Sequence, residues 1–171
     1  DLSQISLEAG DTDVGAVTED EAVTNNQLST NGHLTVTDAD SSDTAAFDVN
    51  SVTSTNTLGT LTIDENGNWV YNIDNTLAAV QGLDEGESFT ETFTVMTIDG
   101  QTHEITVTVN GTADATETNA DTALVNEDSS VVIDVLANDS DIDSEKSPVV
   151  SVTNDANGTV SINSDGTVTY T

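Results

Sequence analysis

Two stretches of this chain repeat the same pattern, and that repeat constrains the fold more than any other feature. Residues 59–72 align without gaps with residues 158–171, at an offset of 99 positions. A second pair of blocks, residues 17–20 and 125–128, aligns at an offset of 108, so the second copy is nine residues shorter between these blocks. A period of about a hundred residues is the size of a domain. The sequence therefore predicts two related modules.

Within the repeat, apolar residues alternate with polar ones, as in half-buried β-strands. Leu61 and Ile63 precede Asn66-Gly67, and Trp69 and Tyr71 follow it. Asn-Gly between two alternating runs is the strongest short-range signal for a β-hairpin. Residues 164–166, Ser-Asp-Gly, occupy the same place in the second copy. The sequence predicts one hairpin in each module at this point.

The rest of the first module also favours short strands. Alternating residues 93–95 and 105–109 flank a turn at Asp99-Gly100, and residues 33–36 indicate an earlier strand. Residues 76–83 are the exception, because their apolar residues share one face of a helix, so one or two helical turns are expected there. Many short strands separated by turn signals predict an all-β fold of the β-sandwich type.

The expected domain boundaries follow from the repeat. Residues 1–13 are expected to be a leader or the tail of a preceding module, residues 14–113 a first sandwich, residues 114–122 a short acidic linker, and residues 123–171 a second sandwich. The first module continues for 41 residues beyond Asn72, whereas Thr171 is already the matching point of the second copy. The second sandwich is therefore expected to be incomplete at its C-terminus.

The charge of the chain excludes several classes of partner. Thirty-two acidic residues and one base, Lys146, give a formal net charge of −31 over 171 residues. Binding to nucleic acid or to anionic membrane surfaces needs Lys and Arg, so neither is expected. The self-repulsion favours bound cations or salt. Cysteine is absent, so disulfides and thiol chemistry are excluded. No apolar run is long enough to span a membrane.

Closely spaced acids in two short loops point to cation binding. Asp38, Asp40 and Asp43 have an altered copy in Asp139, Asp141 and Asp143. Several carboxylates in one short turn repel each other unless a hard cation such as calcium accepts their oxygens. The EF-hand pattern fails, because glycine is missing at the sixth position and valine stands at the twelfth. A solvated acidic turn remains the alternative.

Two calcium clusters at module ends follow as a hypothesis. The first would comprise Glu19, Asp20, Asp38, Asp40 and Asp43, closed by Asp11 or Asp13. The second would comprise Glu127, Asp128, Asp139, Asp141 and Asp143, closed by Asp114. Calcium at such places would replace the flexibility of the linker with a fixed angle and hold an extended rod. Extracellular sites of this kind bind at about 10⁻⁴–10⁻³ M.

Several blocks of the chain resemble known repeats. Residues 32–40, 59–72, 78–86 and 99–103 together resemble a VCBS repeat covering about residues 14–113. Residues 123–171, with Asn126-Glu127-Asp128, are similar to bacterial cadherin-like repeats. The resemblance implies tandem Ig- or cadherin-like Greek-key β-sandwiches in a giant bacterial cell-surface adhesin of the repeats-in-toxin type. It also implies an extracellular location, calcium loading, and neighbouring repeats of the same chain as partners.

Other functions have weaker support in the sequence. His33 and His103 lack the spacing of a zinc or catalytic site, so surface positions are expected. Trp69 and Tyr71 alternate with polar residues and are expected in the core rather than on a sugar-binding platform. The chain is not expected to be an enzyme. The runner-up function is a glycan- or protein-binding module of the same kind of adhesin. Donation of residues 2–7 as a strand to another copy is a further alternative.

Overall fold

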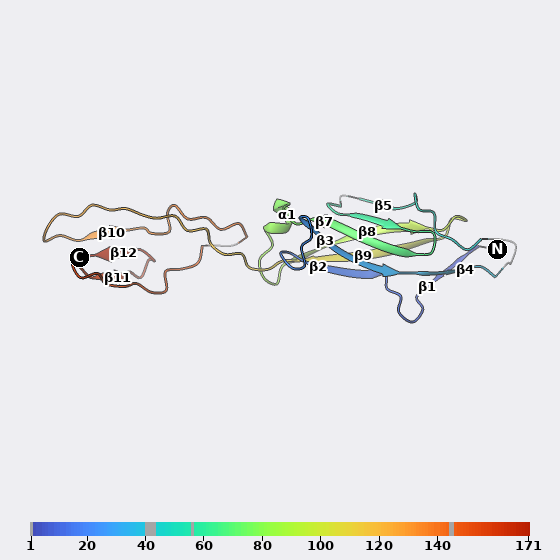
Figure 1. Ribbon diagram of the computed structural model, residues 1–171, viewed down its shortest axis with the longest axis horizontal. Helices are drawn as coiled ribbons and strands as arrows, with labels where there is room; N and C mark the ends of the chain where they lie inside the picture. Colours follow the sequence, from blue (N-terminus) through green and yellow to red (C-terminus); the bar gives the residue numbers. More distant parts are fainter. Residues whose placement is uncertain (1, 40–43, 56, 144–145) are drawn as a thin grey trace. The chain divides into compact units, whose positions relative to one another are not determined.

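The computed structural model describes residues 2–39, 44–55, 57–143 and 146–171. The chain divides into two compact units, Asp1–Thr112 and Ala113–Thr171 (Figure 1). Within the described residues, strands dominate and the helical part is one short turn. Among these residues, no helix has the length and apolar character needed to cross a membrane. The predicted all-β class is confirmed.

Unit 1 contains two main sheets. The first has the order β3-β7-β6, all antiparallel. The second has the order β2-β9-β8-β5, in which β2 runs parallel to β9 and the other pairs are antiparallel. The bounds are β2 Val14–Thr18, β3 Gln27–His33, β5 Thr53–Ser54, β6 Thr60–Ile63, β7 Asn68–Asp74, β8 Ser88–Met96 and β9 Thr102–Asn110.

The core of unit 1 follows from the alternation along these strands. Trp69 and Tyr71 on β7 are fully buried, as predicted. The Tyr71 ring meets the Phe93 ring of the opposite sheet edge to face, at a centroid distance of 5.7 Å. Val107 and Val109 on β9 are likewise fully buried. Because successive side chains point to opposite faces of a strand, the alternation fixes which face is the core.

The short helix α1, Ala78–Gln81, lies inside the stretch predicted to be helical. Val80 is its fully buried residue. The helix ends at Gly82, whose backbone N–H donates to Ala78 O at 3.1 Å. The prediction of one or two helical turns is thus confirmed.

The first thirteen residues belong to unit 1, which differs from the expected leader. Strand β1, Gln4–Ser6, pairs antiparallel with β4, Thr35–Thr37, and places Ile5 opposite Val36. The Thr12 carbonyl also accepts a hydrogen bond of 2.8 Å from the Trp69 indole. The alternation that suggested a strand for donation to another copy is therefore satisfied within the same chain.

The described residues of unit 2 form one sheet of the order β10-β12-β11, with β10 at Val131–Ile133, β11 at Val160–Ile162 and β12 at Val168–Tyr170. The expected linker is part of this unit, because Glu117 forms an antiparallel bridge with Ser140 through backbone hydrogen bonds of 2.7 and 3.0 Å. Backbone groups of the linker thus find partners in the acidic loop, and the segment is not an independent connection.

The register of the two hairpins is the same, as the repeat predicts. In unit 1, Leu61 lies opposite Tyr71 and Ile63 opposite Trp69. In unit 2, Val160 lies opposite Tyr170 and Ile162 opposite Val168. These pairs are related by the offset of 99 positions found in the sequence.

The hairpin glycines of the two units are expected to differ in their tolerance of alanine. Gly67 and Gly166 both have positive φ, +90° and +85°. A Cβ at Gly67 would lie 2.0 Å from Leu34 O, whereas nothing lies within 4 Å of a Cβ at Gly166. Gly166→Ala should therefore cost only the left-handed strain of about 1–2 kcal/mol, and Gly67→Ala clearly more. Urea denaturation of both variants tests this, and equal losses would contradict it.

Candidate cation sites

Asp139, Asp141 and Asp143 stand at every second position of one loop in unit 2, and they face residues 114–119, which precede its sheet. Residues at every second position of an extended segment point the same way, and the Glu117–Ser140 bridge fixes their register. The hydrogen bonds run from Asp114 N–H to Asp143 Oδ2, from Thr116 Oγ1 to Asp141 Oδ2 and from Asn119 N–H to Asp139 Oδ1, each at 2.7 Å.

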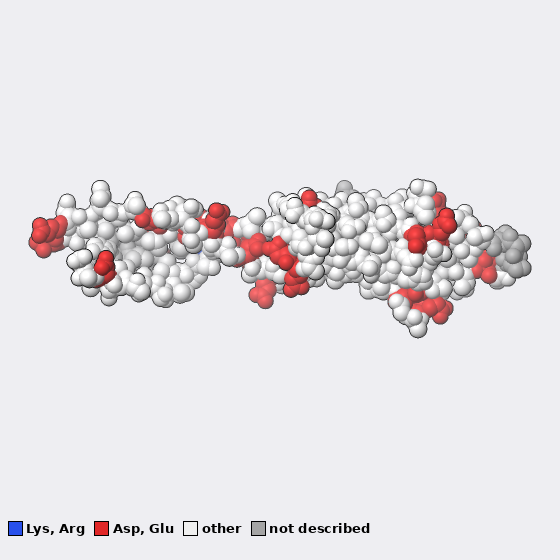
Figure 2. All heavy atoms as spheres, in the orientation of Figure 1, with Lys and Arg blue, Asp and Glu red and all other residues white. Residues whose placement is uncertain are grey.

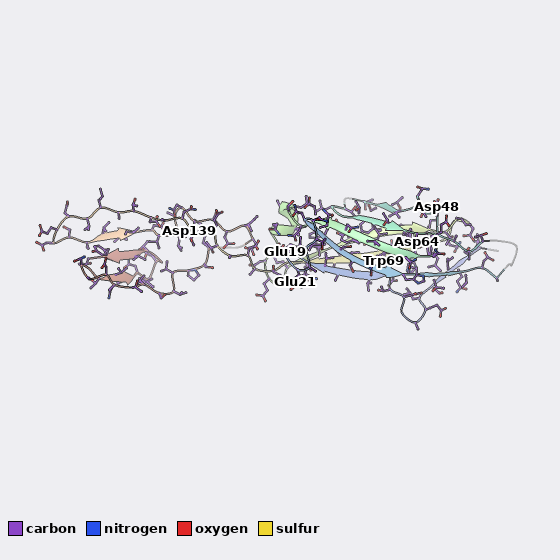
Figure 3. All side chains as sticks on the ribbon, in the orientation of Figure 1. Glu19, Glu21, Asp48, Asp64, Trp69 and Asp139 are labelled. Atoms are coloured by element: carbon purple, nitrogen blue, oxygen red, sulfur yellow. The ribbon has the colours of Figure 1, made fainter. Side chains whose placement is uncertain are left out.

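Burial makes this acidic loop unusual. Asp139 is only 8% exposed, and its position is labelled in Figure 3. Asp143 Oδ1 is buried and accepts no hydrogen bond within the described residues. Lys146, the single base of the chain, donates instead to the Leu136 carbonyl at 2.6 Å. A buried carboxylate oxygen without a donor is costly, and a bound cation is one of the groups that can satisfy it.

Glu127 and Asp128 do not join this loop. Both are exposed in the turn before β10, and Asp128 has a positive φ of 60°. The acidic loop follows β10, so the strand separates the two groups. Across the described ranges, no group of three or more His, Cys, Asp or Glu side chains could hold a metal ion as placed. The structure thus places Asp114 beside Asp143 and aligns Asp139, Asp141 and Asp143 along the segment 114–119, whereas Glu127 and Asp128 lie in a separate turn.

In unit 1, Glu19 and Asp20 lie where β2 ends. Glu19 is fully buried, and its backbone N–H donates to Asn110 O at 2.9 Å. Asp20 has a φ of 57° and is held by Asn75, which accepts from the Asp20 N–H at 3.0 Å and donates to Asp20 Oδ1 at 2.6 Å. Gln81 of α1 adds a hydrogen bond to the same oxygen at 3.2 Å.

Asp38 lies at the other end of the same sandwich. Ser3 Oγ donates to Asp38 Oδ2 at 3.5 Å, and the Ser3 N–H donates to Asp99 in the turn between β8 and β9. Glu19 lies beside Asn110, at the far end of β9. Eight residues of strand correspond to about 26 Å. The first predicted cluster is therefore divided between two ends of unit 1. Asp40 and Asp43 lie outside the described residues.

Asp11 and Asp13, expected to close that cluster, pair with the two histidines. His33 Nδ1 lies 2.6 Å from Asp11 Oδ1, and His33 Nε2 lies 3.0 Å from the Asn66 carbonyl. His103 Nε2 lies 3.0 Å from Asp13 Oδ2. The hydrogen bond from His33 holds the pKa of Asp11 well below its usual range. The sequence predicted surface histidines and missed these pairs, because the partners come from separate strands and loops.

A buried carboxylate in unit 1 was also not anticipated. Glu91 on β8 is 4% exposed. Its side chain accepts hydrogen bonds from Tyr71 Oη at 2.7 Å, from the Gly59 N–H at 3.0 Å and from the Leu58 N–H. Burial, together with the Glu91 hydrogen bond, raises the pKa of Tyr71. Because backbone and hydroxyl donors already satisfy this carboxylate, we assign it a structural role.

Lowering the pH should destabilise the fold of unit 1, because it protonates the Asp99 carboxylate. Hydrogen bonds from Thr97 and from the Ser3 backbone lower the pKa of Asp99 from 3.8 to about 2. A lowered folded-state pKa stabilises the fold above the unfolded value, and this stabilisation is lost as the pH falls from about 4 to about 2. Asp99→Asn should flatten the pH dependence of stability in this window. Chemical denaturation at several pH values measures it, and an unchanged slope would contradict the assignment.

Most remaining acids are surface groups. On the face drawn in Figure 2, acidic atoms of unit 1 gather toward strand ends and loops, and little acid covers the middle of the unit. Threonine occupies many outward strand positions instead, including Thr90, Thr92 and Thr94 of β8. This placement agrees with the preference of β-branched polar residues for an exposed pleat.

Comparison with known proteins connects this architecture to two families of bacterial domains. A family model described as a bacterial cadherin-like domain matches residues 8–111, and one described as a bacterial Ig domain matches residues 113–171. No curated protein matches the chain. The structure is similar to a protocadherin gammaB7 EC3-6 cis-dimer structure, with 14% identity and a TM-score of 0.47. That alignment covers 93% of this chain and 37% of the protocadherin chain, so this chain spans about a third of its length.

The cadherin-like resemblance predicted from the sequence is confirmed, and it falls on the first unit rather than the second. The second unit matches the bacterial Ig model instead. Domains of these two kinds are typically extracellular structural modules of adhesion proteins without catalytic activity. The cadherin-like match covers more than half of the residues. The chain therefore belongs to the family of bacterial cadherin-like domains.

Proposed function

We propose that this chain is a calcium-rigidified structural extender of a bacterial cell-surface adhesin or extracellular fibre, with a VCBS-type first module and no catalysis. In this function the module separates other parts of a long protein and transmits force, and neighbouring repeats of the same chain are its partners. The observation that carries the proposal is that the buried Asp143 Oδ1 accepts no hydrogen bond from the described residues, in a loop where Asp139 and Asp141 face the same segment.

The chemistry of these donors fits calcium. Asp139, Asp141 and Asp143 offer only carboxylate oxygens, with Asp114 beside Asp143. Calcium accepts six to eight oxygen ligands in flexible geometry, whereas zinc favours nitrogen and sulfur. When bound, the ion would neutralise the repulsion within the loop. Asp114 and the three acids of the loop would then hold the segment 114–119 against the acidic loop. This connection would stiffen the start of unit 2.

Glu19 and Asp20 are the corresponding candidates in unit 1. Glu19 is fully buried and Asp20 is anchored by Asn75 and Gln81. The surrounding residues therefore hold two acids in fixed positions at the end of β2. The protein has a net charge of −31, so both the end of β2 in unit 1 and the acidic loop of unit 2 attract cations as counterions.

Calcium is expected to raise the melting temperature of unit 2. For a site with a dissociation constant of about 1 mM, 10 mM calcium adds about 1.4 kcal/mol per site, which is about 5–10 °C for a small domain. Calorimetry with calcium and with chelator measures the shift. Asp143→Asn should reduce it, and Asp121→Asn, an exposed acid of the same unit, should leave it unchanged. An identical melting temperature with and without calcium would overturn the metal role.

The runner-up, a glycan- or protein-binding module, gains no support from a specific observation. Trp69 and Tyr71, the aromatic residues that would offer a stacking surface for sugar, are fully buried in unit 1. The spacer function therefore stands as the proposal for this chain.

A further inference from the structure

Strands β2 and β9 are the first and the last strands of the two main sheets of unit 1, and they pair in parallel. Val14 lies opposite Thr106 and Thr18 opposite Asn110, so all five residues of β2 are in register with β9. At the start of this pair, the Thr106 N–H donates to the Asp13 carbonyl at 2.9 Å. At its end, the Asn110 side chain donates to the carbonyl before Thr18 at 3.2 Å. The pair is therefore hydrogen-bonded from one end to the other.

The chain reaches the two ends of β9 at opposite ends of the sandwich. The Ser3 N–H donates to Asp99 in the turn before β9, whereas the Glu19 N–H donates at 2.9 Å to Asn110, the last residue of β9. Both strands run along the long direction of unit 1 (Figure 1). Because the strands are parallel, tension on the chain pulls β2 toward its start and β9 toward its end. The pair is then in shear, and its evenly spaced hydrogen bonds are loaded together.

Three consecutive residues in front of β2 are each held by a side chain from a different strand. The contacts join His33 Nδ1 to Asp11 Oδ1 at 2.6 Å, Trp69 Nε1 to the Thr12 carbonyl at 2.8 Å and His103 Nε2 to Asp13 Oδ2 at 3.0 Å. Of these strands, β3 and β7 belong to one main sheet and β9 to the other. The Asp11 side chain is only 6% exposed, so water screens its contact little. Residues 11–13 are thus tied to both sheets at once.

We propose that residues 11–13 and the β2–β9 pair form the load-bearing clamp of unit 1. Tension along the chain passes to both sheets at residues 11–13 and is resisted by the sheared pair behind them. The core between the sheets stays closed until this clamp breaks, so the clamp sets the force at which unit 1 unfolds. The biological meaning of the clamp rests on the proposed extender function. Its contacts are hydrogen bonds between protein groups, so it is measured in chelator.

Two pairs of cysteine handles distinguish shear from peeling in the full 171-residue chain. The natural sequence has no cysteine, so Leu7→Cys combined with Ala113→Cys, or with Ile98→Cys, gives two unique attachment points. Leu7 and Ile98 are 50% and 57% exposed, and Ala113 is also exposed. The first pair of handles pulls β2 and β9 from opposite ends. The second pulls them from the same end, because Ile98 lies in the turn before β9. Strand β1 precedes Leu7 and is outside both force paths.

Single-molecule extension in chelator should give a rupture force several times higher for the first pair of handles than for the second. The hydrogen bonds of the pair must break together in shear, whereas peeling breaks them one after another. Unfolding should lengthen the chain by up to about 370 Å between residues 7 and 113 and by up to about 320 Å between residues 7 and 98. These lengths identify unit 1 as the part that unfolds. Equal rupture forces for the two pairs of handles would overturn the clamp.

A matched pair of variants tests the role of residues 11–13. Forced unfolding depends on the unfolding rate. Asp11→Ala removes one hydrogen bond to a charged group, so at constant force in the shear geometry the rupture rate should rise about tenfold. Glu85→Ala, which changes an exposed acid in the turn before β8, should leave the rate unchanged. An unchanged rate for Asp11→Ala would show that residues 11–13 carry no load. Since all of this is measured in chelator, failure of the clamp would leave the calcium proposal standing, and a melting temperature indifferent to calcium would leave the clamp standing.

Discussion

Replacing Trp69 with alanine is expected to lower the free energy of unfolding of unit 1 by about 4 kcal/mol. The indole is fully buried between the two sheets, and its Nε1–H donates to the Thr12 carbonyl at 2.8 Å. The substitution removes the largest side chain of the core and leaves a cavity. It also leaves the Thr12 carbonyl without its donor, which weakens the attachment of the N-terminal residues to the sandwich.

Urea denaturation followed by far-ultraviolet circular dichroism measures this loss, because the variant lacks the fluorescent residue. Val70→Ala is the matched control, since Val70 is the next residue of β7, points outward and is 37% exposed. That change should cost less than about 1 kcal/mol. Similar losses for the two variants would show that the inward and outward faces of β7 have been assigned wrongly.

Replacing Glu91 with alanine is expected to lower the stability of unit 1 by about 3 kcal/mol. The change removes the acceptor for Tyr71 Oη and for the backbone N–H groups of Leu58 and Gly59. Each buried donor without a partner carries a desolvation cost. Trp69 fluorescence reports unit 1 in this variant, because Trp69 is the single tryptophan.

Two further variants separate charge from shape at this position. Glu91→Gln keeps one acceptor oxygen, so it should lower the free energy of unfolding by about half as much as Glu91→Ala. Tyr71→Phe combined with Glu91→Gln gives a double-mutant cycle, with an expected coupling of about 1 kcal/mol. A change at Thr92, which points to the opposite face, should have little effect. An unaltered unfolding curve for Glu91→Ala would show that the hydrogen bonds of this carboxylate contribute nothing to the fold.

Local signals in the sequence were sufficient for the hairpins and for the short helix. The alternation around Asn66-Gly67 predicted β6, β7 and their hairpin, and the repeat predicted the equivalent hairpin of unit 2 in the same register. The helical spacing of residues 76–83 predicted α1. These features depend on side-chain periodicity and on backbone preferences of a few neighbouring residues, so no knowledge of distant contacts was needed.

Glu91 could have been found by the same reasoning. It is in phase with Phe93 and Val95 on β8, and both of those residues are buried. An acid on the inward side of an alternating strand must find donors or remain unfavourable. The identity of those donors, Tyr71 and the backbone of residues 58–59, depended on how the two sheets face each other, and no local pattern contains that information.

The sequence alone determined the class of the fold, its two related units, its hairpins and its strongly acidic character, because each of these depends on composition or on short-range periodicity. The tertiary structure decided which acids are neighbours. Parallel pairing of β2 with β9 places Glu19 beside Asn110, whereas Asp38 lies near the opposite end of β9, and the Glu117–Ser140 bridge brings Asp114 to Asp143. Distances between acids far apart in the chain follow from strand pairing, and strand pairing is a property of the whole folded chain.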